Sequence, residues 1–270
     1  MSFDRLRTQV LCETLVGCTD LGQWNTYRAV FESLNLTSEQ VHVLKSTLLE
    51  DAKDLYFKGL LSLSEAIYSM SRRLYSWATI KAYYSVFYLL RGSLALRDYA
   101  IVRNRSLYLL PLKVGESPKK KSSDRYRNDH VCVINVYRDL YANSDMLQSN
   151  TVDELNPYEW LMERRNQINY RQREFLDPNP PNFLQLISGL IQSHKLDELI
   201  TAYVGDTRYL YCFQSNHACL ALPIRRLFLT KEEFVKANNS LIFPQEKIDL
   251  VRKLLVINSE PLKSVDEFIV

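Results

Sequence analysis

The sequence WATIKAYYSVFYLLR, from Trp77 to Arg91, is the part of the chain that most clearly determines its fold. Large apolar residues recur every three or four positions through and beyond it, namely Trp77, Ile80, Tyr84, Phe87, Leu90 and Leu94. This spacing is typical of the buried face of an α-helix. The pattern reaches from Ser64 to about Leu96. Because two arginines interrupt it, we expect a break between two helices near Tyr75-Ser76.

Further helices are indicated on both sides of this stretch. Thr37-Ser38-Glu39-Gln40 has the pattern of a capping box and predicts a helix to about Leu55. Asn156 and Pro157 are suited to the cap and first turn of a helix. The remaining apolar patterns predict helices over residues 129–141, 157–175, 183–203 and 245–256, with short helices in residues 1–35.

Strand signals are fewer, as expected for a chain with only seven glycines. A short strand is predicted at 107–112. A hairpin is predicted from strands 209–213 and 218–229, followed by a short helix capped by Thr230. The prolines of 177–181 indicate a linker. The sequence therefore predicts a mainly α protein, with an N-terminal extension (1–36), a four- to five-helix bundle (37–205) and a small α/β C-terminal region (206–270).

Composition excludes several classes of protein. The 270 residues are 46% hydrophobic and 24% charged, as in an ordinary globular protein. No apolar run has membrane-spanning length and the N-terminus lacks a signal-peptide pattern, so we expect a cytoplasmic protein without a membrane partner. The five cysteines are scattered and read as reduced thiols. Cys212, His217 and Cys219 supply at most three ligands, so we expect neither a metal nor another cofactor.

Positive charge is concentrated in one segment. Residues 103–127 contain eight Lys or Arg and two acidic residues, a local balance of +6 in a chain of net charge +3. Such a segment suits a polyanionic partner, or it is a solvated, mobile loop. The candidate RNA contacts here are Lys119, Lys120, Lys121, Arg125, Arg127 and the nearby His130.

A second basic cluster lies in the predicted helix 157–175. The sequence ERRNQINYR, from Glu163 to Arg171, combines arginines, amides and a tyrosine. In a helix, Arg165, Asn166, Asn169 and Tyr170 share an arc of roughly 140°. Guanidinium and amide groups on one face suit the binding of a phosphate. The alternative is an ordinary solvent-facing surface whose charges Glu163, Glu174 and Asp177 neutralise.

Two motifs resemble those of HEPN domains. Ala82-Tyr83-Tyr84-Ser85-Val86-Phe87 is similar to a pattern in the second helix of that superfamily. Arg165-Asn166 resembles the motif of its functional helix, where an arginine and a polar residue precede a histidine. The resemblance covers roughly residues 40–190. It implies a helical bundle that dimerises and, in many members, cleaves RNA without a metal in toxin–antitoxin or phage-defence systems.

The resemblance implies roles for particular residues. Arg165 would hold the phosphate and stabilise its transition state, Asn166 and Asn169 would orient RNA, and Arg164 and Arg171 would add contacts. Tyr170 stands where the family has histidine. It would position the substrate or take the 2′-hydroxyl proton, which requires a lowered pKa because tyrosine ordinarily titrates near 10.

The leading hypothesis is therefore a homodimeric HEPN-like endoribonuclease, acting on RNA as a toxic effector, with a cognate antitoxin or defence protein as a further partner. The alternative is a non-catalytic helical module that binds a protein or nucleotide. A third reading makes Tyr170 the target of a partner nucleotidyltransferase. No glycine-rich phosphate loop, Ser-His-Asp order or paired carboxylates point to other chemistry.

Overall fold

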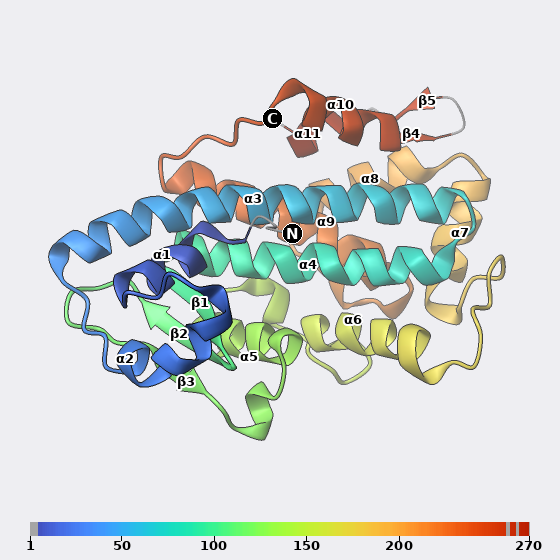
Figure 1. Ribbon diagram of the computed structural model, residues 1–270. Coiled ribbons are helices and arrows are strands. Elements are labelled where there is room, and N and C mark those ends of the chain that lie inside the picture. Colours follow the sequence, from blue (N-terminus) through green and yellow to red (C-terminus); the bar gives the residue numbers. More distant parts are fainter. Residues whose placement is uncertain (1–4, 258–259, 263–264, 270) are drawn as a thin grey trace. The chain divides into compact units, whose positions relative to one another are not determined.

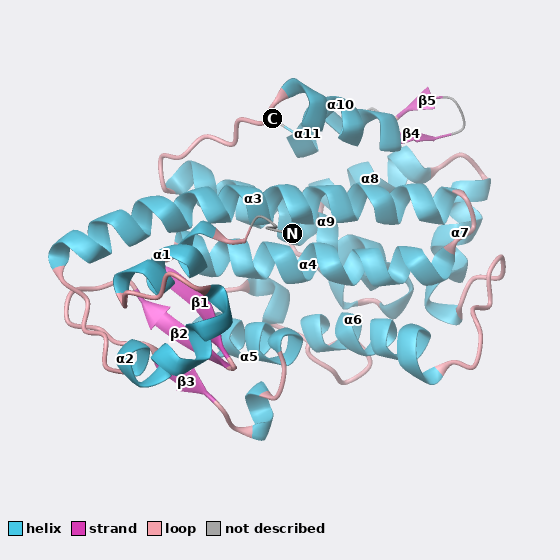
Figure 2. Ribbon diagram, in the orientation of Figure 1, coloured by secondary structure: helices cyan, strands magenta, loops and turns pink. Residues whose placement is uncertain are grey.

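The computed structural model describes residues 5–257, 260–262 and 265–269. The protein is mainly helical, as the sequence predicts (Figure 1, Figure 2). It also contains a small three-stranded sheet, of which the sequence predicts one strand. The chain forms two compact units. Unit 1 comprises Met1–Leu55 and Leu90–Leu140, and unit 2 comprises Tyr56–Leu89 and Tyr141–Val270.

Two long helices contribute to both units. Helix α3 (Ser38–Ser71) passes into unit 2 after Leu55, and α4 (Tyr75–Leu96) returns to unit 1 at Leu90. The predicted break between them is confirmed, since residues 72–74 are not helical and Arg73 has a positive φ of 61°. The predicted end of α3 at Leu55 is wrong. The apolar pattern of α3 continues to the break at residues 72–74, and no proline or pair of glycines ends the helix earlier.

Unit 1 contains the small three-stranded sheet. Its other elements are α1 (Arg7–Leu15), η1 (Leu21–Tyr27), α2 (Arg28–Glu32), β1 (Tyr99–Asn104), β2 (Ser106–Pro111), β3 (Lys119–Lys121), η2 (Asp124–Tyr126) and α5 (Asp129–Tyr141). The short N-terminal helices, the strand near 107–112 and the helix 129–141 confirm the predictions. Strands β1, β2 and β3 are antiparallel in that order. Trp24, Phe31 and Tyr108 pack edge to face beside the sheet.

Unit 2 consists almost entirely of helices. Beyond its parts of α3 and α4 it contains η3 (Met146–Gln148), α6 (Pro157–Asn166), η4 (Gln167–Arg171), η5 (Asn182–Leu184), α7 (Gln185–Gln192), α8 (Leu196–Gly205), η6 (Leu210–Phe213), α9 (Ser215–Lys236), α10 (Gln245–Leu254), β4 (Val256–Ile257), β5 (Glu260–Pro261) and α11 (Val265–Ile269). Helix α10 confirms the helix predicted at 245–256 within two residues.

Helix α9 overturns the predicted hairpin. Residues 209–213 form the short helix η6, and 218–229 lie inside α9, which is buried on nearly every side. A helix buried all round has no polar face, so its apolar run cannot be told from a buried strand by periodicity. Thr230 does not cap a helix either. Its hydroxyl donates to the carbonyl of Arg226 within α9, at 2.8 Å.

Three further expectations are corrected. The helix predicted over 183–203 is divided at residues 193–195, where His194 has a φ of 58°. The helix predicted over 157–175 ends at Arg171. Trp77, predicted in the buried stripe, is 49% exposed, while Ile80, Phe87, Leu90 and Leu94 are buried as expected.

Within unit 2, α3 and α4 lie close together at Gly59. A Cβ atom there would lie 2.6 Å from Cγ of Leu89 and 3.3 Å from the carbonyl oxygen of Ser85. Glycine is ordinarily unfavourable inside a helix by about 1 kcal/mol relative to alanine. Here the missing side chain is what lets the two helices pack. No helix among the described residues is both long and apolar enough to cross a membrane.

Candidate functional site

Helix α6 is fixed in unit 2 by its first two turns. The side chain of Asn156 accepts a hydrogen bond from the backbone N–H of Tyr158 at 3.1 Å, which confirms the predicted cap. The Tyr158 hydroxyl donates to Asp145 at 2.5 Å, and Nε1 of Trp160 donates to Asp153 at 2.8 Å. Both rings are buried. The end of the helix that carries the arginines is therefore held on a rigid base.

A π-helical turn follows α6 directly. Over Gln167–Arg171 the hydrogen bonds span five residues, as in the bond from Gln172 N–H to the Gln167 carbonyl at 2.9 Å. Such turns are rare and are found disproportionately at functional sites. The wider turn places position i+5 above position i. It brings the ring of Tyr170 over the guanidinium of Arg165, with 4.8 Å between Cζ and the ring centroid.

Arg165 is enclosed by three tyrosines. Its guanidinium also lies 5.7 Å from the ring centroids of Tyr83 and Tyr84, which α4 contributes. Nη2 donates to the Tyr84 hydroxyl at 3.2 Å, and Nη1 donates to Oδ1 of Asn166 at 2.9 Å. Only 7% of Arg165 is exposed. Burial raises the pKa of Tyr83 above its usual value, against the lowering effect of the Arg165 charge.

The positive charge of Arg165 has no acidic partner among the described residues, and its Nε–H is buried without an acceptor. A buried charge ordinarily costs several kcal/mol unless it is paired. Cation–π contacts offset part of that cost, at about 0.5–2 kcal/mol each. The remainder favours an anion, and a phosphate accepts hydrogen bonds from a guanidinium fork in good geometry.

The other arginines of the cluster are neutralised or turned away. Arg171 forms an ion pair with Glu163 at 2.5 Å. Arg164 lies over the rings of Trp160 and Phe183, at 5.1 and 5.8 Å from their centroids. It also donates to Gln167 at 3.0 Å. Arg165 is therefore the arginine of this stretch whose charge is both buried and unpaired within the described part of the chain.

The structure brings together three of the residues predicted at this site, Arg165, Asn166 and Tyr170. Asn169 is exposed, and no contact to Arg165 is found. Tyr170 is 67% exposed, so its ring covers the guanidinium on the solvent side. Rotation of the Tyr170 side chain would give an anion access to Arg165, whereas Tyr83 and Tyr84 are fixed in α4.

The candidate RNA contacts of residues 119–130 lie in unit 1. Lys119, Lys120 and Lys121 form β3, the edge strand of the sheet, and pair with Leu109, Tyr108 and Leu107. Lys119 pairs with Glu116 at 2.8 Å, and the Lys121 ammonium lies 4.9 Å from the Tyr126 ring centroid. Lysines on an edge strand also discourage pairing with other chains. The strand accordingly has a structural explanation beside the electrostatic one.

The neighbouring candidates differ in how far their charge is compensated. Arg125 pairs with Asp139, which also accepts from the Tyr126 hydroxyl. Arg127 is exposed and has no ion-pair partner among the described residues. His130 is the second residue of α5. Lys120 and Arg127 thus keep the most available charge in this group.

Thiols and histidines form no metal site in the described ranges, where no three His, Cys, Asp or Glu side chains are placed to hold an ion. All five cysteines are unpaired and buried. Burial raises the pKa of Cys12 and of Cys219 to about 12, which keeps them protonated and unreactive. The buried His217 accepts or donates a hydrogen bond at Nδ1 with the Tyr203 hydroxyl, at 2.8 Å.

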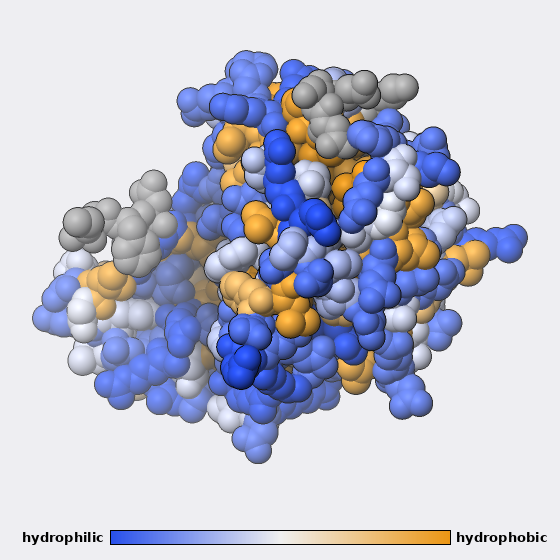
Figure 3. Space-filling view, turned by 90° about the vertical axis from the view of Figure 1, so that its right-hand side faces the viewer, coloured by the Kyte–Doolittle hydropathy of each residue, from blue (hydrophilic) through white to orange (hydrophobic). Residues whose placement is uncertain are grey.

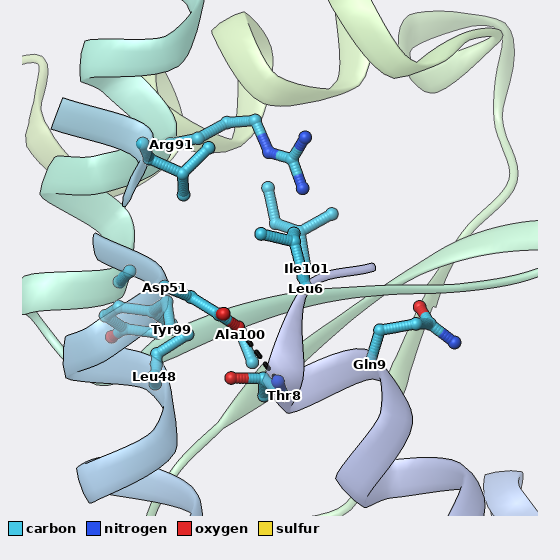
Figure 4. A pocket seen from close by; sticks show the side chains of 11 residues that line it. Leu6, Thr8, Gln9, Leu48, Asp51, Arg91, Tyr99, Ala100 and Ile101 are labelled. Atoms are coloured by element: carbon cyan, nitrogen blue, oxygen red, sulfur yellow. Dashed lines mark hydrogen bonds between the residues drawn. The ribbon is translucent and has the colours of Figure 1, made fainter. Parts of the chain in front are cut away.

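Unit 1 contains a small pocket at the start of α1 (Figure 4). The buried Asp51 of α3 points to this helix start and accepts from the backbone N–H groups of Arg7 and Thr8, both at 2.8 Å. It therefore caps α1 from another helix. The pocket volume of about 20 Å³ has room for about one water molecule and none for a nucleotide.

The sequence pattern does not predict the tyrosine rings that surround the Arg165 guanidinium. The apolar spacing places Tyr84 in the buried face of its helix, and the neighbouring Tyr83 is 1% exposed. Tyr84 is half-buried and serves the site instead. The sequence gives one indication of this role. Tyr84 follows Tyr83 by one position, so its side chain projects about 100° away from that of Tyr83 around the helix.

The arrangement defines a mainly helical protein with a buried, unpaired guanidinium at the end of one helix, covered by an exposed phenol. Comparisons with protein-family models, with curated proteins and with solved structures found no match to this chain. Its function is therefore inferred from the site.

Proposed function

We propose that this protein is a HEPN-like, metal-independent endoribonuclease. It acts as a homodimer on cytoplasmic RNA and is the toxic effector of a phage-defence or toxin–antitoxin module. The observation that carries the proposal is the Arg165 guanidinium, which is 7% exposed, has an orphaned Nε–H and no acidic partner in the described residues. The HEPN resemblance rests on Arg165-Asn166 and on Ala82–Phe87, and the latter segment supplies two walls of the same site.

In this proposal the 2′-hydroxyl of RNA attacks the adjacent phosphorus and the 5′-oxygen leaves, giving a 2′,3′-cyclic phosphate and a 5′-hydroxyl. Arg165 binds the phosphate and stabilises the charge that develops on it. Asn166 fixes the orientation of the guanidinium through its 2.9 Å hydrogen bond. Tyr170 swings from the guanidinium as RNA enters. Its hydroxyl positions the 2′-hydroxyl or, as the phenolate, takes its proton, and the resulting phenol then gives a proton to the leaving 5′-oxygen.

The test is cleavage of total RNA by the pure protein in EDTA, with end-group analysis of the products. Arg165→Ala is expected to reduce cleavage by about 100- to 1,000-fold, the usual effect of removing one transition-state donor. Arg165→Lys keeps the charge without the fork and should retain part of the activity. The matched control is Arg252→Ala, because the Arg252 side chain is 48% exposed and pairs with the exposed Asp266 at 3.0 Å, outside the candidate site.

Tyr170→Phe separates the two roles of that side chain. It keeps the ring over Arg165 and removes the hydroxyl, so cleavage is expected to fall while binding is retained. An Arg165→Ala protein that cleaves RNA as fast as the wild type would refute the proposal.

The second candidate is a non-catalytic helical module that binds a protein partner or a nucleotide. The observation in its favour is the occupant of position 170, a tyrosine that closes over the guanidinium instead of an exposed histidine. Intact RNA together with retained, Arg165-dependent binding would identify this function.

A further inference from the structure

Two aromatic side chains of unit 2 are held together on its surface. Trp77 of α4 and Phe175, which follows the π turn, are 49% and 44% exposed. Their ring centroids are 5.8 Å apart with an interplanar angle of 74°. The other two tryptophans, Trp24 and Trp160, are buried. In the view of Figure 3, hydrophobic side chains lie in small groups between hydrophilic ones.

The position of Phe175 is fixed by Asp177. Its carboxylate accepts a hydrogen bond from the backbone N–H of Ser76 at 3.2 Å and another from the Ser76 hydroxyl. Ser76 lies in the first turn of α4, where unpaired N–H groups and the helix dipole favour a carboxylate. The bond ties residues 172–177 across the start of α4, one residue from Trp77. The aromatic pair is thus a built feature of the fold.

The charges around the pair indicate its occupant. Arg72 and Arg73 precede α4 and are exposed, and Arg171 and Arg173 precede Phe175. Arg171 is paired with Glu163 at 2.5 Å and Arg173 with Glu174 at 3.2 Å, while Asp177 caps α4. Arg72 and Arg73 have no ion-pair partner among the described residues, so they carry the uncompensated charge of this group. Exposed rings between arginines match a ligand with planar apolar groups on a negative backbone. That is a nucleic acid whose bases are unpaired, since a duplex conceals its base faces.

Helix geometry relates the pair to Arg165. Tyr84, which accepts a hydrogen bond from Arg165, follows Trp77 by seven residues and therefore lies on the same face of α4, about 10 Å along its axis. At about 3.4 Å per stacked nucleotide, this corresponds to about three nucleotides. An RNA strand that binds Arg165 through one phosphate can thus place a base about three nucleotides away at Trp77.

We infer that Trp77 and Phe175 form a stacking site for a base of unpaired RNA, about three nucleotides from the phosphate held at Arg165. The inference deepens the proposed function, on which it rests for the phosphate position, by naming single-stranded RNA as the substrate class.

The experiment measures binding without cleavage. The probe is a labelled 2′-O-methyl oligoribonucleotide of about 12 nucleotides, which lacks the attacking hydroxyl, used single-stranded or annealed to its complement. Trp77 is the one half-exposed tryptophan, so quenching of intrinsic fluorescence reports on its ring. We expect quenching by the single strand and a far smaller change with the duplex.

Variants then test each ring by fluorescence anisotropy. Trp77→Ala and Phe175→Ala are each expected to weaken single-strand binding about tenfold, because stacking on an aromatic side chain contributes about that much. Trp77→Phe keeps a stacking surface and should bind within about threefold of wild type. The matched control is Leu74→Ala, which removes a neighbouring apolar side chain without a ring and should leave affinity unchanged. Circular dichroism melts establish that each variant is folded.

Unchanged affinity in both alanine variants would overturn the inference, as would equal loss in Leu74→Ala. Alanine variants that alter the sedimentation of the protein and not its affinity for RNA would identify a protein contact, which also overturns it. The two proposals fail separately. Cleavage that is independent of Trp77 leaves the ribonuclease and removes the stacking site, whereas ring-dependent binding without cleavage leaves the stacking site and removes the ribonuclease.

Discussion

Unit 2 contains three buried arginines, and two of them, Arg226 and Arg165, have opposite surroundings. Arg226 of α9 is 1% exposed and lies 3.4 Å from Asp145 and 2.6 Å from Glu233. Its Nε–H donates to Thr230 at 3.1 Å. Arg165 of α6 is nearly as buried, yet tyrosine rings and one amide take the place of the carboxylates.

The difference distinguishes a charge that stabilises the fold from a charge that is available to bind an anion. The charge of Arg226 is compensated twice over, so a further anion would be repelled by two carboxylates. The charge of Arg165 is only screened by the faces of aromatic rings, which attract a cation without neutralising it. Burial alone therefore does not indicate the role of an arginine. The chemical identity of its neighbours does.

The largest expected effect tests whether Arg226 stabilises the fold and Arg165 does not. Arg226→Met leaves Asp145 and Glu233 without their partner and should reduce the free energy of unfolding by about 3–5 kcal/mol. Arg165→Met removes a buried charge without orphaning a carboxylate and should change it by no more than about 1 kcal/mol. Urea denaturation of both variants gives the two values. Equal losses would mean that Arg165 is as structural as Arg226.

A smaller effect is expected from the ring that covers Arg165. Tyr170→Ala removes one partly exposed cation–π contact and should cost about 0.5–1 kcal/mol of stability. Tyr170→Phe keeps the ring and should cost nothing measurable. The same urea titrations distinguish these variants. A loss in the phenylalanine variant equal to that in the alanine variant would show that the hydroxyl, and not the ring, makes the stabilising contact.

The smallest effect concerns His217, a histidine of unit 2 that is buried beside Tyr203. Burial lowers the pKa of His217 from its usual value of 6.5. The unfolded chain therefore binds a proton before the folded one, and stability is full above pH 6.5 and falls as the pH drops below it. Thermal melts across this range should show the decline, and His217→Gln should flatten it. An unchanged decline in the glutamine variant would assign the effect to other groups.

Local signals explain how much of the fold the sequence predicts. Asn156 before Pro157 marks the start of α6 because both residues act on the helix end next to them. The interruption by Arg72 and Arg73 marks the end of α3 for the same reason. The apolar run of α9 misleads because its burial depends on helices far away in the chain. The break at residues 193–195 lacks a glycine or proline that would signal it.

The candidate site divides in the same way. The helical repeat predicts that Arg165, Asn166 and Tyr170 share a face, and they do meet. The π turn that sets Tyr170 over Arg165 has no sequence signal. Tyr84 lies 81 residues before Arg165 and is brought there by packing alone. The pairing of Arg171 with Glu163 and of Arg173 with Glu174 realises the alternative in which local acids neutralise arginines.

Gly59 places a mechanical constraint on this site without touching it. A methyl group at position 59 would meet the side chain of Leu89 and the carbonyl of Ser85, both on α4. Ser85 follows Tyr84, whose hydroxyl accepts a hydrogen bond from Arg165. A larger side chain at position 59 would therefore displace α4 next to Tyr84 and alter the contacts of the Arg165 guanidinium. The absence of a side chain at position 59 thus lets α4 lie close to α3 at Ser85, the residue next to Tyr84.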